Sequence, residues 1–309
     1  MGTPEFAVPT LLALIDSKYK PVLIISQPDK PSGRNLHIKP TPVKEVALKY
    51  NIPCFQPEDI NAKDSISHVA TFNPHVLITA AYGAYLKKSI RTMAKHGALN
   101  LHPSLLPLHR GADPVRSTLL AGDSLCGITF FIIKAKMDTG PIIHQVKYDI
   151  PKNYNYSKLE NYLSEKGGDE IIFTVERIFN TDPNEFKEQD HELATYSSKV
   201  EKNVNLIDFN LNFRDFINKL KGYSDEPGYF CFFRNKKLKI YEAEFVSHEI
   251  NNSVGEIKKI INKKGFIVSL SDSDILITEV QYEGKKRMNA HDFYNGARIQ
   301  IGERLTSGI

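Results

Sequence analysis

Short apolar runs alternate with amphipathic helical patterns through the first half of the chain, and this alternation limits the possible folds more than any other feature. Apolar runs lie at residues 21–26, 75–80, 98–101 and 127–133, with helical periodicity between them, as at 43–50 and 114–120. Strands that alternate with helices predict βαβ units and a mostly parallel sheet. Parallel strands are covered on both faces, which explains why the runs are continuously apolar. We expect a Rossmann-like α/β domain.

A change of pattern near residue 204 predicts a second domain. Residues 157–180 have the pattern of one long helix, and a polar stretch of linker composition follows it. Beyond the linker, a helical pattern at 211–221 precedes strand-like runs at 229–233, 237–245, 265–270 and 274–280. Short strands separated by turn residues predict a small OB-like β-barrel. We therefore expect an N-terminal α/β domain over 1–183, a linker over 184–203 and a C-terminal domain over 204–309.

Length and composition exclude several classes of protein. The chain has 309 residues, which suffices for two domains and a large core. No apolar run approaches the ~20 residues of a membrane helix, and the N-terminus lacks the features of a signal peptide. The three cysteines form no CxxC pair, so neither a zinc knuckle nor a thioredoxin-type site is indicated. We expect a cytoplasmic protein that does not bind membranes.

The densest cluster of reactive side chains lies just beyond the third apolar run, at residues 100–111. Asn100 ends the predicted strand and His102 follows two residues later, so both side chains project the same way from an extended chain. Ligands of open α/β sheets bind beyond the carboxyl ends of the strands. Asp138, which follows the fourth run, adds a carboxylate to the same edge.

An amide, an imidazole and a carboxylate around one crevice suit acyl transfer. The amide N–H stabilises an oxyanion, the histidine exchanges a proton, and the carboxylate stabilises the charged histidine. No GxSxG motif is present and no cysteine lies nearby, so direct transfer is favoured over a covalent enzyme intermediate. On these residues alone, an ordinary turn at Asn100 and His102, and a turn or helix cap at Asp138, remain alternatives.

An ordered set of motifs extends over nearly the whole chain. It consists of Gly2-Thr3-Pro4-Glu5-Phe6-Ala7, Gln27-Pro28-Asp29-Lys30-Pro31, Pro40-Thr41-Pro42-Val43-Lys44, Ala81-Tyr82-Gly83, Asn100-x-His102, Ser104-Leu105-Leu106-Pro107-x-x-Arg110-Gly111, Asp138-Thr139-Gly140 and Gly284-Lys285-Lys286-Arg287-Met288. The set resembles the folate-dependent formyltransferases. The resemblance implies transfer of a formyl group from 10-formyltetrahydrofolate to the α-amino group of methionyl-initiator tRNA.

The resemblance also implies roles for individual residues. Asn100, His102 and Asp138 are the expected catalytic residues, with the acid and base roles of His102 and Asp138 left open. The expected folate contacts come from Ser104, Leu105, Leu106 and Pro107. The formyl donor 10-formyltetrahydrofolate is the one cofactor implied, and no metal is expected, because the spacing of the histidines and Asp138 matches no metal-ligand pattern. The expected partner is charged initiator tRNA, bound by a monomer.

A basic segment at residues 30–44 contains no acidic side chain. Such a segment can neutralise phosphates in a nucleic-acid groove, and its alternative is a solvated loop. The resemblance favours contact with tRNA through Lys30, Arg34 and Lys39, and through Lys199 and Lys202 in the linker. Further basic residues of the C-terminal part include Arg234, Lys236, Lys237, Lys239, Lys258, Lys259, Lys285, Lys286 and Arg287.

The chain departs from the family pattern most clearly at its start. Family members carry a short apolar strand before the Gly-Thr-Pro segment, where this chain begins. We therefore expect either a misassigned start or a sheet that lacks part of a central strand. The chain also has no tryptophan, and it carries Ser224-Asp225-Glu226-Pro227 where the family often has Asn-Pro-Trp-Pro.

Three other functions remain as alternatives. A formyltransferase acting on another amine, such as a sugar nucleotide, shares the Asn-His-Asp chemistry but lacks the basic 30–44 segment together with this C-terminal domain. A non-catalytic RNA-binding protein does not explain the three intact catalytic positions. A nicotinamide dehydrogenase needs a GxGxxG motif after a strand, and the sequence has none.

Overall fold

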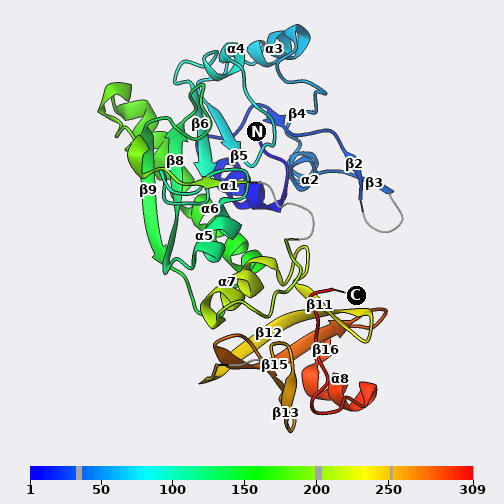
Figure 1. The fold of residues 1–309 in the computed structure, drawn as a ribbon. Coiled ribbons are helices and arrows are strands. Elements are labelled where there is room, and N and C mark those ends of the chain that lie inside the picture. The colour runs from blue at the N-terminus through cyan, green and yellow to red at the C-terminus, as the bar shows by residue number, and fades with distance from the viewer. Residues whose placement is uncertain (33–36, 199–203, 251–252, 309) are drawn as a thin grey trace. The chain divides into compact units, whose positions relative to one another are not determined.

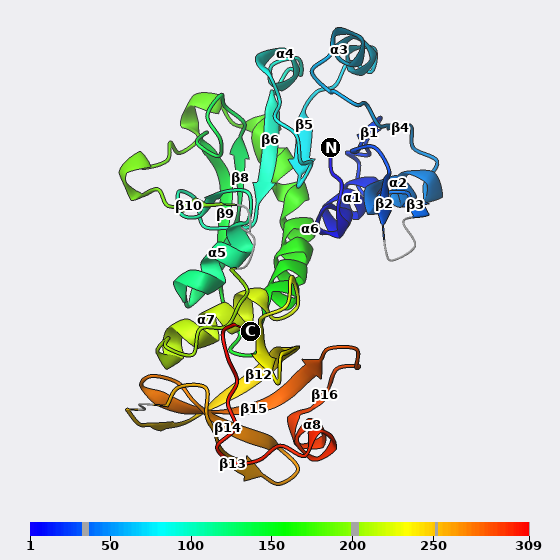
Figure 2. The ribbon, with the colours of Figure 1, turned by 45° about the vertical axis from the view of Figure 1, so that its right-hand side comes forward.

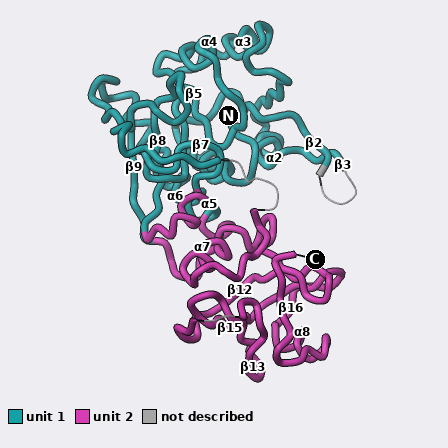
Figure 3. Tube along the Cα trace, viewed as in Figure 1, with its two compact units in different colours: residues 1–114, 125–149, 160–198 teal, residues 115–124, 150–159, 199–309 magenta. Residues whose placement is uncertain are grey.

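The computed structural model describes residues 1–32, 37–198, 204–250 and 253–308. The chain forms two compact units that interleave along the sequence (Figure 3). Unit 1 contains residues 1–114, 125–149 and 160–198, and unit 2 contains 115–124, 150–159 and 199–309. The predicted domain limits at 183 and 203 stay a prediction. None of the helices in the described ranges is long and apolar enough to cross a membrane.

Unit 1 consists of helices and short strands in alternation (Figures 1 and 2). Its helices are η1 (Glu5–Ala7), α1 (Val8–Ile15), α2 (Pro42–Lys49), α3 (Lys63–Ala70), α4 (Lys88–Arg91), most of α6 (Tyr156–Asn180), η2 (Pro183–Glu185) and η3 (His191–Leu193). Its strands are β1 (Ile24–Ile25), β2 (Lys30–Ser32), β3 (His37–Lys39), β4 (Cys54–Phe55), β5 (Leu77–Ala80), β6 (Ala98–His102), β7 (Arg110–Gly111), β8 (Leu125–Ile132), β9 (Ile142–Asp149) and β10 (Tyr196–Ser197).

The central strands of unit 1 confirm the predicted α/β class. β1 pairs with β4 in parallel, and β5, β6, β8 and β9 form a sheet in that order. β5 and β6 are parallel, whereas β6, β8 and β9 are antiparallel to one another in turn. The backbone of α6 approaches β6 closely at Gly167, where a Cβ atom would lie 2.4 Å from the side chain of Leu101. α6 therefore covers the sheet at the strand that carries Asn100 and His102.

Met1 and Gly2 lie between β1 and β5. The amide of Gly2 donates to the carbonyl of Ile25, and Gly2 forms a parallel bridge with Ala80. The ammonium group of Met1 donates to the carbonyl of Ile78 at 2.7 Å, and burial lowers the pKa of this ammonium to about 5. A groove of about 580 Å³, lined mainly by apolar residues of β1, β5 and α1, adjoins Met1. Gly2 therefore joins the sheet through a single isolated bridge between β1 and β5.

Unit 2 contains the antiparallel strands of the C-terminal part. Its elements are α5 (Pro114–Ala121), the first turn of α6, α7 (Phe213–Tyr223), β11 (Phe230–Phe233), β12 (Lys236–His248), β13 (Ile257–Ile261), β14 (Gly265–Ser269), β15 (Ser273–Tyr282), β16 (Met288–Asn289) and α8 (Ala290–Ala297). The first residue of α5, Pro114, is counted with unit 1. The strand order is β11-β12-β15-β14-β13, with β16 paired to β15.

The sheet of unit 2 is joined at its edges by the C-terminal segment. Thr306 forms a bridge with Phe232 on β11, and Arg304 forms a bridge with Glu256 just before β13. Register shifts in the pairing of β12 with β15 let the long strand β12 bend. Phe293 of α8 packs on the rings of Phe233, Phe266 and Tyr282. These contacts give unit 2 a barrel-like core of its own, as the turn-separated strands predict.

Candidate active site

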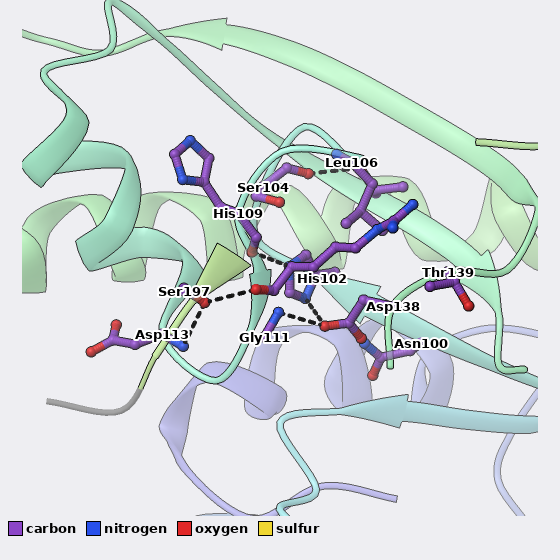
Figure 4. Close-up of polar contacts among 12 residues, drawn as sticks. Asn100, His102, Ser104, Leu106, His109, Gly111, Asp113, Asp138, Thr139 and Ser197 are labelled. Carbon is purple, nitrogen blue, oxygen red and sulfur yellow. Dashed lines mark hydrogen bonds and ion pairs between the residues drawn. The ribbon is translucent and has the colours of Figure 1, made fainter. Parts of the chain in front are cut away.

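β6 presents Asn100 and His102 on one face of the sheet. They are two residues apart on a strand, so their side chains project to the same side. The hydroxyl of Thr79, the register partner of Asn100 on β5, donates to Asn100 Oδ1 at 2.6 Å. This contact orients the amide so that its NH₂ end points away from Thr79. Figure 4 shows how Asn100, His102 and Asp138 lie within the site.

His102 is buried, and two neighbours determine its protonation. The carbonyl of His109 lies 3.0 Å from His102 Nε2. A carbonyl only accepts hydrogen bonds, so Nε2 carries the proton of the neutral ring and Nδ1 carries the lone pair. Nδ1 lies 3.9 Å from Asp138 Oδ2. Burial lowers the pKa of His102, and the Asp138 carboxylate and the His109 carbonyl offset this only in part. The ring is therefore a neutral base at neutral pH.

Asp138 lies in the turn between β8 and β9, with a positive φ of 53°. Its Oδ2 accepts the amide of Gly111 at 2.8 Å. Gly111 has φ +120°, and a Cβ atom there would lie 2.3 Å from the carbonyl oxygen of Ser197. At Gly140, a Cβ atom would lie 1.7 Å from the carbonyl oxygen of Ile132. Both motif glycines are therefore required by close backbone contacts around the turn of Asp138.

The predicted folate-binding residues Ser104, Leu105, Leu106 and Pro107 directly follow β6 and fold back onto β8. The hydroxyl of Thr129 donates to the Ser104 carbonyl at 2.7 Å and accepts the amide of Leu106 at 3.2 Å. The side chain of Gln145 donates to the Leu106 carbonyl at 2.9 Å. The Ser104 hydroxyl itself donates to the carbonyl of Leu108. The segment is thus fixed next to His102, and its contact with folate stays a prediction.

Residues of the predicted linker contribute to the site, which the sequence did not indicate. Thr195 accepts the amides of His109 and Arg110 through its hydroxyl and its carbonyl, at 2.8 and 2.9 Å. β10 pairs in parallel with β7, and the Ser197 hydroxyl accepts the amide of Asp113 (Figure 4). A two-residue strand in a polar stretch leaves no periodic pattern, so composition indicated only a linker. Residues 160–198 belong to unit 1, and the linker bounds of 184–203 stay a prediction.

The basic segment begins with the β2–β3 hairpin and ends in the first turn of α2. β2 and β3 are antiparallel, and Lys30 and Lys39 are exposed register partners. Lys44, at the other end of the segment, forms an ion pair with Asp29. Arg34, Lys199 and Lys202 lie outside the described residues. The tRNA contacts of Lys30 and Lys39 stay a prediction.

Three of the C-terminal basic residues form ion pairs within unit 2. Arg234 contacts Glu303 at 2.8 Å, Arg287 pairs with Glu279, and Lys258 lies 3.0 Å from Asp274 and 3.3 Å from Glu249. These pairs join neighbouring segments of the barrel. The charge of these three side chains is therefore partly neutralised by the protein itself.

The site provides a base, a carboxylate and an amide donor for direct group transfer. The free cysteines are poor nucleophiles, since burial raises the pKa of Cys126 to about 11 and also raises the pKa of Cys54. Among the residues that the structure describes, no three His, Cys, Asp or Glu side chains are grouped to hold a metal ion. The α/β fold and this site define an enzyme of the acyl- or formyl-transferring class.

Comparison with known proteins identifies the family. Residues 1–175 match the family described as formyl transferase, and residues 199–298 match the formyl transferase C-terminal domain. The methionyl-tRNA formyltransferase of a Sulfurihydrogenibium species is 36% identical over 305 residues, covering 98% of each chain. That of Bacillus subtilis is 34% identical over 306 residues, covering 99% of this chain and 96% of its own. The chain belongs to the methionyl-tRNA formyltransferase family.

Solved structures show the same fold at lower similarity. The N-formyltransferase from Helicobacter canadensis, in complex with folinic acid and dTDP-3-aminofucose, has a TM-score of 0.64 and 19% identity. The alignment covers 91% of this chain and 97% of that one. At this identity the likeness shows the arrangement of the elements and not the substrate.

Proposed function

We propose that this protein transfers the formyl group of 10-formyltetrahydrofolate to the α-amino group of methionyl-initiator tRNA. The products are N-formylmethionyl-tRNA, used in translation initiation, and tetrahydrofolate. The observation that carries the proposal is the contact of His102 Nδ1 with Asp138 at the carboxyl end of β6. It occurs in a chain 36% identical, over nearly its whole length, to a methionyl-tRNA formyltransferase.

Each catalytic residue has a distinct task in this reaction. The free amine of the methionyl group attacks the formyl carbon, and Nδ1 of His102 takes the proton that the amine loses. The carboxylate of Asp138 stabilises the imidazolium ion that results. The NH₂ group of Asn100 donates to the formyl oxygen as it gains negative charge. The bond from the formyl carbon to folate N10 then breaks, and His102 returns its proton to N10.

The other predicted site residues bind the two substrates in this proposal. Ser104, Leu105, Leu106 and Pro107 contact the folate, which is supported by their fixed position next to His102. Lys30, Arg34, Lys39, Lys199 and Lys202 contact tRNA phosphates, which is supported by the exposure of Lys30 and Lys39 on the hairpin. The enzyme acts as a monomer on charged initiator tRNA in the cytoplasm, where that tRNA is used.

The direct experiment measures transfer of labelled formyl from 10-formyltetrahydrofolate to methionyl-initiator tRNA. Uncharged tRNA and methionyl-elongator tRNA serve as controls. Transfer confined to charged initiator tRNA is the expected result. Transfer to an amino sugar nucleotide in its place would contradict the proposal and favour the alternative amine. Tetrahydrofolate formation measured in the same reaction shows whether loss of formyl from the donor matches its transfer.

A further inference from the structure

The side chain of Gln189 makes four hydrogen bonds in the interior of unit 1. Its Oε1 accepts from Arg110 Nε at 3.1 Å and from a terminal nitrogen of the same guanidinium at 2.6 Å. Its Nε2 donates to the carbonyls of Asp138 at 3.0 Å and of Gly140 at 2.8 Å. Gln189 is 6% exposed and Arg110 is 2% exposed. Solvent therefore does not substitute easily for any of these partners.

These partners require an amide at position 189. The guanidinium of Arg110 only donates hydrogen bonds, and the carbonyls of Asp138 and Gly140 only accept them. A side chain between them must accept at one end and donate at the other. Glutamate would present oxygen to both carbonyl oxygens, and methionine would satisfy neither end. The same contacts determine which end of the Gln189 amide is oxygen and which is nitrogen.

The two ends of Gln189 hold the two segments that meet at His102. Arg110 lies between His109, whose carbonyl contacts His102, and Gly111, whose amide contacts Asp138. The opposite end of Gln189 holds the backbone of Asp138 itself. We propose that Gln189 is a positioning residue that fixes the Asp138 carboxylate relative to His102 by joining β7 to the turn of Asp138. The expected loss of kcat in variants of Gln189 rests on the proposed formyl transfer. The expected change in the titration of His102 does not depend on that function.

His191 completes the partners of the Arg110 guanidinium. Its Nδ1 lies 2.8 Å from Arg110. Because a guanidinium donates only, Nδ1 accepts and carries no proton. Gln189 and His191 are therefore both neutral partners of this buried cation. Replacing Gln189 with glutamate places a carboxylate next to Arg110 while removing both donors to the turn of Asp138.

Two substitutions separate positioning from stability. Gln189→Glu keeps an acceptor for Arg110 and adds an opposite charge, whereas Gln189→Met removes both contacts and leaves Arg110 buried with one fewer partner. A matched control is Ser164→Ala on α6. This change removes another buried hydrogen bond, which the Ser164 hydroxyl donates to the carbonyl of Phe6. The measurements are Tm, kcat and KM for each substrate, and the titration of His102 by NMR in the enzyme without substrates.

We expect both Gln189 variants to lose at least about tenfold in kcat while KM for 10-formyltetrahydrofolate stays within about twofold, since misplaced catalytic groups cost rate more than binding. The Glu variant is expected to lose rate although its Tm stays close to that of the wild type. Ser164→Ala is expected to keep its kcat. The inference is overturned if kcat falls only in those of the three variants whose Tm also falls, so that the Glu variant is as active as the wild type.

The NMR titration makes the inference independent of the proposed function. His102 is faced by the carboxylate of Asp138 and by the backbone carbonyl and ring of His109, and Asp138 raises its pKa. If Gln189 holds Asp138 in place, the pKa of His102 falls in Gln189→Met, which introduces no charge, and stays unchanged in Ser164→Ala. An unchanged His102 titration in Gln189→Met refutes the positioning role. Absence of formyl transfer by the wild-type protein refutes the proposed function and leaves the titration result standing.

Discussion

At the scale of single residues, the charged form of His102 depends on one carboxylate. Asp138→Asn preserves the shape of the side chain and an acceptor for the amide of Gly111, but removes the negative charge near Nδ1. We expect kcat to fall by roughly 10²–10⁴, the usual contribution of general acid–base catalysis, with the fold intact. Turnover and Tm are the measurements. The control Asp169→Asn, on the exposed side of α6, is expected to leave kcat unchanged.

The same substitution shifts the pH profile in a defined direction. The proposed base is neutral His102, so activity is lost as pH falls through the pKa of this ring. Burial lowers that pKa and Asp138 raises it, so removal of the carboxylate lowers it further. We expect the acidic limb of kcat against pH to move to lower pH in Asp138→Asn, although the plateau is lower. A limb that stays in place or moves to higher pH would contradict the role of His102 as the base.

Residue chemistry singled out Asn100, His102 and Asp138, because each is a reactive type near the end of a predicted strand, and the structure places His102 Nδ1 3.9 Å from Asp138. Their catalytic roles came from the family resemblance and stay a prediction. The motif glycines Gly111 and Gly140 were visible in the sequence, but the reason why each position requires glycine was not. The reason is that the carbonyl oxygen of Ser197 lies close to Gly111 and that of Ile132 lies close to Gly140, and these contacts form only in the tertiary structure. Gln189 was not predictable, since a glutamine in a polar stretch has no pattern that distinguishes a buried crosslink from a solvated side chain.

At the scale of elements, the sequence predicted best where burial dictates composition. The run at 98–101 corresponds to β6 and the pattern at 157–180 to α6, both within one residue at each end. The shorter strands were harder to predict. Only Ile24–Ile25 of the run at 21–26 pairs as a strand, and β9 alternates between partly buried and exposed positions only from Val146 to Asp149. The direction of β8 and β9 depends on long-range pairing that no local pattern encodes.

The buried ammonium group of Met1, next to the bridge of Gly2 with Ala80, gives a prediction about stability. The pKa of the Met1 ammonium falls from 8.0 to about 5 on folding, so the unfolded chain binds more protons between these values. Stability from this group is therefore full above pH 8 and is lost as pH falls toward 5. Five apolar, β-forming residues added before Met1 would extend the chain into the groove of about 580 Å³ and move the charge out of the interior. We expect a higher Tm, with the larger gain at pH 6.

A polar extension of equal length is the control for this prediction. Gly and Ser residues also move the ammonium group away, but they bury little apolar surface. We expect them to reduce the pH dependence of Tm between 5 and 8 without the full gain in Tm. An apolar extension that leaves Tm unchanged at both pH values would show that the groove does not accept a strand.

At the scale of the whole molecule, charge must act locally in binding nucleic acid. The net charge of +4 is small for a chain of 309 residues. Within unit 2, Arg234, Arg287 and Lys258 are already paired with acidic side chains. Exposed cations without such a neighbouring carboxylate are therefore the better candidates for phosphate contacts. Lys30 and Lys39 on the β2–β3 hairpin are exposed, and the 30–44 segment contains no acidic residue.

Reversal of both hairpin charges tests this reading. In Lys30→Glu with Lys39→Glu we expect KM for methionyl-tRNA to rise by at least about tenfold, because two phosphate contacts are lost and two repulsions are added, while KM for 10-formyltetrahydrofolate changes little. Each phosphate contact also contributes roughly 0.7–0.9 to the slope of log binding constant against log salt. The slope of log KM for tRNA against log salt should therefore decrease. Lys87→Glu with Lys88→Glu, exposed at the start of α4, changes the net charge equally. If this control raises KM for tRNA as much as the hairpin variant does, net charge and not the hairpin governs tRNA binding.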